Sequence, residues 1–366
     1  VCNAYYINVR GHDMKKLFTY LTMVFILLSL VSCGPQDKAS KQDEGAGPAE
    51  KYTDIKGNKP KKEQKDIDYS AVKPNELGQV MILMYHDIGD KESEWVRTPD
   101  NFRKDLKTLY DKKFRLISLN NFLDGNIKTA AGYTPVVITF DDGDLGQFKV
   151  KMAGGKPQPD PDTAVGILID FCKEHPDFGS CATFYIYHPL PFREKEYIDY
   201  KLKFLVDNGF EIGNHTDTHS SLSKLDGNGI EKELGLNVWH TQRYLPGYKV
   251  NTLALPYGSV ANEYTKYLLD GRYEDTVYHN KAVLLVGANP AKSPYDAEFD
   301  NIKLPRIRAS EMDVEGFGLY DWIKYFNKHP DKRYISDGDP DTIVIRKGME
   351  DNIRKGEFGN KKIISY

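Results

Sequence analysis

Two adjacent aspartates, Asp141 and Asp142, follow the apolar run V-V-I-T-F and precede Gly143. Apolar and β-branched residues without helical spacing predict a buried strand, so we expect both carboxylates at its carboxyl end. In α/β folds, that end of the strands carries the chemistry. Two neighbouring carboxylates repel each other and are costly to bury unless a cation or hydrogen bonds hold them. Alone, the pattern also fits an ordinary turn after a strand.

Two histidines, His215 and His219, lie four residues apart in E-I-G-N-H-T-D-T-H. On a helix, this spacing places both imidazoles on one face about one turn apart, and it makes Asp217 a helix-surface acid. With one carboxylate, from Asp141 or Asp142, the pair forms a two-histidine, one-carboxylate set that leaves room for a metal-bound water. The sequence therefore predicts a metal-dependent hydrolytic site.

Other apolar runs alternate with helical patterns along the chain. Residues 79–86 read Q-V-M-I-L-M-Y-H, which predicts the first core strand with His86 at its carboxyl end. Thr98 caps a helix that Pro99 begins. Strands alternating with helices favour an α/β fold with a parallel sheet. Further strands are expected at 114–119, 182–186, 211–213, 252–255, 283–287 and 302–307, and helices at 119–125, 165–175, 197–208, 230–244 and 313–328.

The N-terminal part differs in composition from the rest of the chain. A basic start at Met14, an apolar run over 17–31 and the small residues before Cys33 predict a signal peptide, so residues 1–33 are interpreted as an upstream extension plus that peptide. Residues 34–75 are rich in Lys, Asp, Glu, Gly and Pro and should form a flexible linker. The net charge of -3, with acids and bases interspersed, gives no reason to expect a nucleic-acid partner.

The motifs T-F-D-D-G and H-T-x-x-H, in this order, resemble those of the polysaccharide deacetylase family, also called the NodB-homology or carbohydrate esterase family 4 enzymes. A-T-F-Y-I at 182–186 and L-P-Y-G at 255–258 are similar to further family motifs. The resemblance covers about residues 80–345, so we expect a catalytic domain over 76–345 and a tail over 346–366. It implies an irregular (β/α)7-type barrel. The sequence L-V-S-C also resembles the lipobox of bacterial lipoproteins, which would make Cys33 a lipidated N-terminus.

The resemblance also implies roles for individual residues. Asp142, His215 and His219 would bind a divalent metal, zinc first, with cobalt or nickel as alternatives. Asp141 would be the general base. This agrees with its position, because the metal would neutralise Asp142 and leave the neighbouring carboxylate of Asp141 free to accept a proton. A backbone N–H at Tyr257 would stabilise the oxyanion.

The chain departs from the family pattern at two catalytic positions. The family arginine before L-P-Y-G is replaced by Ala254, and the late histidine that serves as general acid has no match near L-P-R-I at 304–307. In one interpretation, the chain is catalytically weakened and binds glycans only. In the other, residues from elsewhere take over. M-Y-H at 84–86 resembles the poly-N-acetylglucosamine deacetylase branch, so His86 is the candidate acid, and Arg306 is the candidate replacement for the arginine.

We therefore expect a hydrolase that removes acetyl groups from an N-acetylated or O-acetylated cell-wall or extracellular polysaccharide, such as a glycan that contains N-acetylglucosamine. It would be anchored by lipid to the bacterial membrane, outside the cytoplasm. The alternatives are a non-catalytic glycan-binding lipoprotein and an esterase or amidase for a smaller acylated substrate. Cys172 and Cys181 fit either a disulfide or two free thiols, and the Gly/Pro-rich insertion 144–163 fits either a surface loop or a groove wall.

Overall fold

The structure is a computed structural model that describes residues 67–356, 358 and 360–366. Its main sheet consists of β1 (Met81–Tyr85), β4 (Phe114–Leu116), β5 (Thr134–Phe140), β8 (Thr183–Ile186), β9 (Glu211–Asn214), β10 (Thr252–Ala254), β13 (Ala282–Leu284) and β14 (Ile307–Arg308). The strands run in the order β13, β10, β9, β8, β5, β1 and β14, with β4 paired to β5. Every pair is parallel, so the carboxyl ends of the strands meet at one edge.

The sheet curls until its two edge strands are bridged. The backbone N–H of Leu285 donates to Leu304 O at 2.9 Å, and the N–H of Leu304 donates to Val283 O at 3.0 Å. The segment that leads into β14 therefore lies beside β13, while β14 itself pairs with β1. In the described part of the chain, the path around this curled sheet holds seven strands. The expected α/β fold with an irregular barrel of about seven strands is confirmed.

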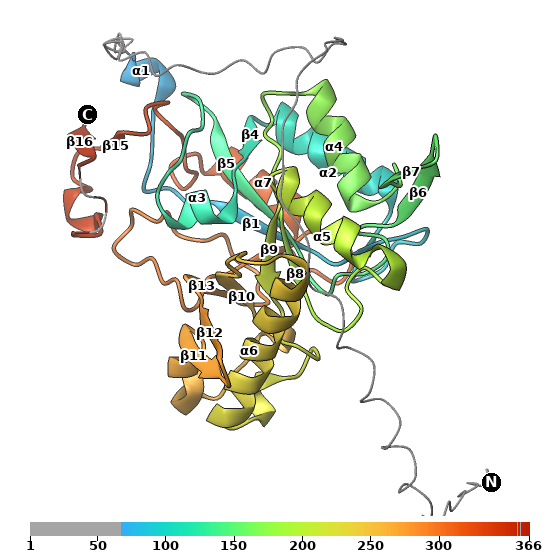
Figure 1. Ribbon diagram of the computed structural model, residues 1–366. Coiled ribbons are helices and arrows are strands. Elements are labelled where there is room, and N and C mark those ends of the chain that lie inside the picture. The colour runs from blue at the N-terminus through green and yellow to red at the C-terminus, as the bar shows by residue number, and fades with distance from the viewer. Residues whose placement is uncertain (1–66, 357, 359) are drawn as a thin grey trace, which may run out of the picture. The chain divides into compact units, whose positions relative to one another are not determined.

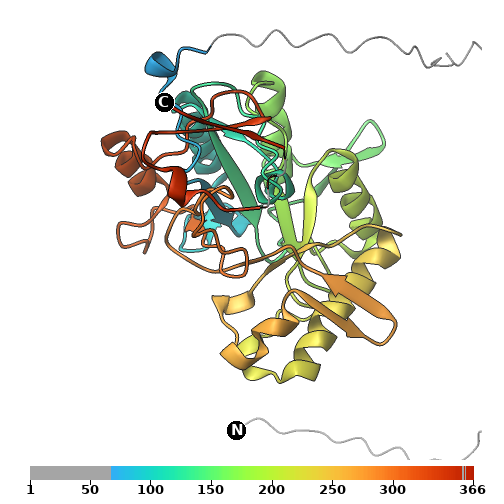
Figure 2. The same cartoon turned by 90° about the vertical axis from the view of Figure 1, so that its left-hand side faces the viewer.

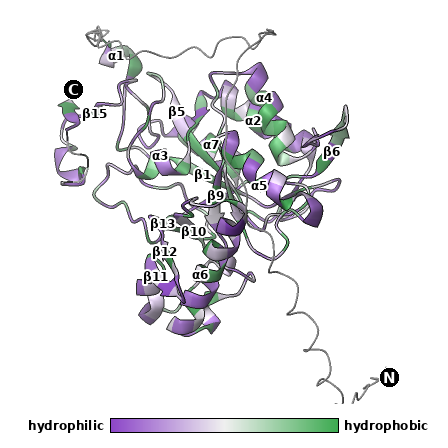
Figure 3. Cartoon of the chain, viewed as in Figure 1, coloured by the Kyte–Doolittle hydropathy of each residue, from purple (hydrophilic) through white to green (hydrophobic). Residues whose placement is uncertain are grey.

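Helices cover the outside of the sheet (Figures 1 and 2). The N-terminus of α2 shows why the sequence predicted it: Thr98 Oγ1 accepts a hydrogen bond from Asn101 N at 3.3 Å, and Pro99 is the first helical residue. The apolar residues of α2 share a buried face. Figure 3 shows helices with one hydrophobic side, in green, and one hydrophilic side, in purple. The helices are α1 (Tyr69–Val72), α2 (Pro99–Asp111), α3 (Leu119–Leu123), α4 (Ala164–Glu174), α5 (Ile198–Asp207), α6 (Gly227–Tyr244) and α7 (Leu319–Lys328).

Short two-stranded sheets lie outside the main sheet. They are β2 (Asp87–Ile88) with β3 (Val96–Arg97), β6 (Val150–Ala153) with β7 (Lys156–Pro159), β11 (Asp270–Tyr273) with β12 (Thr276–His279), and β15 (Thr342–Ile345) with β16 (Lys362–Ser365). The hairpin β6–β7 is formed by the insertion at 144–163. The hairpin β11–β12 packs against α6, and the two lie together at the lower end of Figure 1.

One helix begins later than the sequence predicted. The pattern indicated a helix over 313–328, but α7 begins at Leu319. Glu315 and Gly316 have φ angles of 50° and 85°, in the left-handed region that a right-handed helix does not contain. Gly318 then caps α7, because its N–H donates to the Asp321 carboxylate at 3.1 Å. The residues before Leu319 therefore form a loop.

One compact unit contains the barrel and extends to Tyr366. β16 lies within the expected tail, 346–366, and pairs with β15. Both cysteines in the described residues, Cys172 and Cys181, are free thiols.

The predicted signal peptide, the lipidation site Cys33 and most of the predicted linker fall on residues 1–66, outside the described residues. Among the residues that are described, no helix combines the length and the apolar character needed to cross a bilayer.

Candidate metal centre and active site

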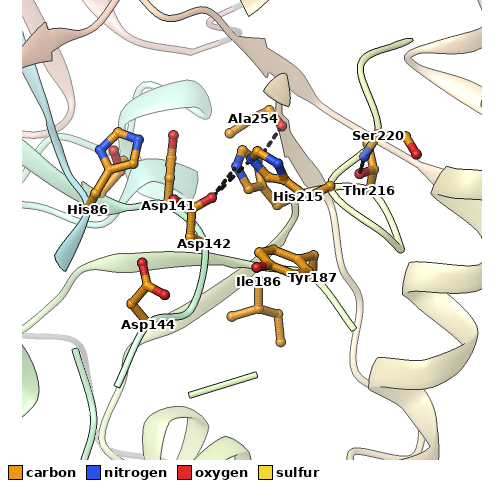
Figure 4. Close-up of polar contacts among 12 residues, drawn as sticks. His86, Asp141, Asp142, Asp144, Ile186, Tyr187, His215, Thr216, Ser220 and Ala254 are labelled. Atoms are coloured by element: carbon orange, nitrogen blue, oxygen red, sulfur yellow. Dashed lines mark hydrogen bonds and ion pairs between the residues drawn. The ribbon is translucent and has the colours of Figure 1, made fainter. Parts of the chain in front are cut away.

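The two aspartates lie where β5 ends. Tyr85 of β1 is in register with Phe140 of β5, so the residues that follow them, His86 and Asp141, lie at the same edge of the sheet. The N–H of Asp141 continues the ladder by donating to Tyr85 O at 3.0 Å. Asp142 then takes a φ of 77°, which turns the chain out of the strand. Figure 4 shows His86, Asp141 and Asp142 side by side.

Asp142, His215 and His219 form the one candidate metal cluster within the described residues. Their ligand atoms all lie within 4.8 Å of one another. The Nε2 atoms of His215 and His219 lie 3.3 and 3.1 Å from Asp142 Oδ1. Burial raises the pKa of the Asp142 carboxyl, but the two facing imidazoles outweigh it and hold this pKa well below its usual range. The carboxylate is thus kept in the charged form that a metal ligand needs.

The hydrogen bond of His215 to the backbone orients its ring toward Asp142, and the three side chains fit a divalent cation. His215 Nδ1 lies 2.8 Å from the Ala254 carbonyl, which can only accept a hydrogen bond, so Nδ1 carries a proton and the Nε2 of the neutral ring is free to bind a metal beside Asp142 (Figure 4). Asp142 Oδ1 is buried and has no hydrogen-bond donor of ordinary geometry among the described residues. With both rings neutral, three ligand atoms with free lone pairs meet at one point, which fits a divalent cation.

The expected helical placement of the histidines is wrong. His215 to Ser220 form a loop after β9, in which Thr216 and His219 have φ angles of 60° and 57°. The i, i+4 spacing brings both rings together because this loop turns tightly. Asp217 is also not a surface acid of a helix, because it is buried and its Oδ1 lies 2.7 Å from His240 Nδ1.

Two side chains of α6 hold this loop in shape. Glu233 Oε2 accepts hydrogen bonds from the N–H groups of Asp217 and Thr218 at 3.0 and 2.9 Å. Asn237 Nδ2 donates to the carbonyl oxygens of Thr216 and Ile186 at 2.7 and 2.8 Å. The turn between the two histidines is therefore fixed by contacts from outside it.

Asp141 is clamped by Arg306. Its two carboxylate oxygens accept hydrogen bonds from Nη1 and Nη2 of Arg306, both at 2.7 Å. The side chains are 1% and 0% exposed. The same guanidinium donates to Thr139 Oγ1 and to the carbonyl of Leu285, which fixes its own orientation. Burial raises the pKa of the Asp141 carboxyl, but the charge of Arg306 outweighs it and keeps this pKa below its ordinary value.

His86 lies on the other side of Asp141 from the metal cluster in Figure 4. Its ring packs against Trp95, with 4.6 Å between ring centroids. Burial lowers the pKa of His86, and the carboxylates of Asp141 and Asp142 oppose this. A ring with a lowered pKa gives up a proton readily to a basic group beside it.

Two tyrosines flank His219. Tyr257 has a φ of 60° and is 68% exposed, and its ring centroid lies 5.0 Å from that of His219. The Tyr187 ring lies 5.2 Å from the same imidazole, and its hydroxyl accepts a hydrogen bond from Arg193 at 2.7 Å. The sequence reasoning named Tyr257 and missed Tyr187, although Tyr187 directly follows β8 at the functional edge and could have been found by that position.

Residues 128–274 match the model of the family described as polysaccharide deacetylase. No curated protein matches the chain. Among solved structures, it is similar to the Streptococcus pyogenes deacetylase PplD in complex with acetate (17% identity, 67% of this chain and 97% of that one, TM-score 0.49). It is also similar to a polysaccharide deacetylase from Bacillus cereus (20%, 68% and 68%, 0.49) and to IcaB from Ammonifex degensii (17%, 64% and 93%, 0.46). The part of the chain that carries Asp142, His215 and His219 thus lies within the residues that match the polysaccharide deacetylase family model.

Proposed function

We propose that this protein is a metal-dependent hydrolase that removes acetyl groups from an N-acetylated or O-acetylated polysaccharide of the cell wall or the extracellular space. The observation that carries this proposal is the pairing of two differently held carboxylates. Asp142 faces two imidazole nitrogens, while its neighbour Asp141 is held by a guanidinium and points to the same edge. One carboxylate is thereby suited to bind a cation and the other to accept a proton.

Asp142, His215 and His219 would hold the metal ion, with zinc proposed first and cobalt or nickel as alternatives. When bound, a divalent metal supplies a Lewis acid that polarises the acetyl carbonyl and activates water. The ring of His215 is oriented for this by its Nδ1–H, which donates to Ala254 O.

Asp141 acts as the general base: it takes one proton from the attacking water while the C–O bond forms. Arg306 fixes both carboxylate oxygens in one plane, so the remaining lone pairs of Asp141 point in defined directions. In this role Arg306 positions Asp141 and replaces the arginine that is absent at position 254.

His86 donates a proton to the leaving amine when the C–N bond of the substrate breaks, so that acetate and a free amino sugar are released. Its place at the end of β1, next to Asp141, supports this role. The backbone N–H of Tyr257 donates to the oxyanion that forms on the acetyl group.

We further propose that the chain works outside the cytoplasm and is tethered to the membrane by a lipid on Cys33, which lies outside the described residues. The motif before this cysteine and the polar composition of residues 34–66 support the tether. Such an anchor would keep the barrel near wall or surface glycans.

The test is release of acetate by the purified chain loaded with zinc, cobalt or nickel. N-acetylglucosamine oligomers, peptidoglycan and acetylated xylan serve as substrates, and Asp141→Asn is measured in parallel. Acetate release that disappears in the variant supports the hydrolase and its base. Glycan binding without acetate release from any substrate would instead support a non-catalytic glycan-binding protein. Equal rates on monomers and long oligomers would support an esterase or amidase for small substrates.

A further inference from the structure

A second groove opens beside the proposed catalytic residues, at the same edge of the barrel. It has a volume of about 200 Å³ and is lined by residues that follow β13 and β14. Met84, Trp95 and Arg308 line both this groove and the smaller cavity that contains His86. The groove is therefore continuous with the candidate active site.

Apolar side chains form the walls of this groove. Trp95, Phe317 and Val286 all line it and are 38%, 47% and 39% exposed. A Cβ placed on Gly258, next to Tyr257, would lie 3.0 Å from Val286 Cβ, so the wall reaches the loop that flanks His219. Trp95 contacts both the ring of His86 and the guanidinium of Arg308, which lies 4.8 Å from its centroid. Such an aromatic surface suits the apolar face of a sugar ring.

The polar part of the groove is acidic. Arg308, the one basic residue that lines it, is paired with Glu94 and with the carbonyl oxygens of Met312 and Asp313. Asp313 and Glu315 also line it, and both residues are exposed. Within the described residues, neither of these two carboxylates has an ion pair or hydrogen bond, so two negative charges remain to face a ligand.

We propose that this groove binds the sugar unit next to the one that is deacetylated, and that it prefers a unit carrying a protonated amine. This inference rests on the proposed function, since a free amino sugar is the product of that reaction. The ring of the sugar stacks on Trp95 and Phe317, while the ammonium group lies near Asp313 and Glu315. A polymer with some units already deacetylated is then a better substrate than a fully acetylated one.

The experiment compares calorimetric binding of a glucosamine tetramer and an N-acetylglucosamine tetramer to the full chain. We expect tighter binding of the glucosamine tetramer by about fivefold, as two partly exposed charge pairs would give. The double variant Asp313→Asn, Glu315→Gln should remove this preference. A matched control, Glu196→Gln with Asp199→Asn, removes the same charge from exposed positions near α5 and should keep it. Phe317→Ala should weaken the binding of both tetramers.

Acetate release is measured separately on fully and partly acetylated tetramers. The glucosamine preference and its loss in the groove variant support the inference even if no acetate forms, in which case the proposed function fails alone. Equal binding of the two tetramers by the wild-type chain, or a preference that survives in the groove variant, overturns the inference, whether or not acetate is released.

Discussion

Replacing Arg306 by methionine is expected to destabilise the fold and to stop acetate release, because it leaves the Asp141 carboxylate buried without its cation. The two side chains form two hydrogen bonds of 2.7 Å and are 0% and 1% exposed. Removing one partner of such a buried pair costs about 3–5 kcal/mol of unfolding free energy. This cost is a large part of the ~5–15 kcal/mol free energy of unfolding of a typical domain, but it leaves enough of the variant folded for its unfolding to be measured.

Urea unfolding measures this cost as a double-mutant cycle of Arg306→Met, Asp141→Asn and the two combined. The combined variant should recover most of the loss, since no charge then remains buried without a partner. Acetate release at saturating metal should fall about 100-fold or more in Arg306→Met, the size expected when a general base is misplaced. Arg306→Lys is the matched control, because it keeps the charge but cannot donate to both oxygens at once; we expect it to fold better than Arg306→Met and to remain slow.

Two results would refute this reasoning. If Arg306→Met unfolds at the same urea concentration as the wild type, the buried charge pair does not have the assumed cost. If the variant is folded and releases acetate at the wild-type rate, Asp141 needs no arginine to act, and the proposed role of Arg306 is wrong.

Three further changes test other parts of the structure. His86→Ala should abolish turnover while the metal content, measured by mass spectrometry, stays at the wild-type level; wild-type turnover would rule out its role as the acid. Glu233→Gln should weaken zinc binding about tenfold in a competition with a chelating dye, because it loosens the loop between the histidines; unchanged affinity would contradict this. Burial raises the pKa of Glu76 to about 8, so the fold retains a proton there that the unfolded chain releases. The free energy of unfolding should therefore fall between about pH 4.5 and 8 by up to ~1.4 kcal/mol per unit, and Glu76→Gln should flatten this slope in urea titrations.

Helices and strands could be predicted from the sequence because short stretches of neighbouring residues determine them. Thr98 and Pro99 mark the start of α2 by cap and ring geometry alone. β5 is a run of apolar and β-branched residues without helical spacing, and every residue in it is buried. The start of α7 was placed too early because the apolar spacing from Leu319 to Phe326 does not mark where the helix begins, and the left-handed backbone of Glu315 and Gly316 is not visible in that spacing.

The candidate active site could be predicted only in part, because its geometry depends on contacts between segments that are far apart in the sequence. The spacing of His215 and His219 is the same in a helix and in the tight loop that they occupy, and the choice depends on Glu233 and Asn237 of α6. That Asp141 meets Arg306, 165 residues later, follows from the closing of the barrel and not from any local pattern. His86 and Asp141, in contrast, follow neighbouring strands in register and could be placed together from the order of strands alone.

The closing of the barrel also explains how an arginine at position 306 can serve where the resemblance led us to expect one at position 254. A carboxylate at the centre of the carboxyl-terminal edge can be reached from any strand that ends or passes there. β10 supplies the Ala254 carbonyl that orients His215, while the segment that bridges β13 and β14 supplies the guanidinium. Holding Asp141 in place requires a guanidinium beside its carboxylate. In a barrel of seven parallel strands, an arginine near the end of more than one strand can reach that position. The missing arginine in the motif is therefore weak evidence against the proposed activity, because Arg306 contacts Asp141 from the segment before β14.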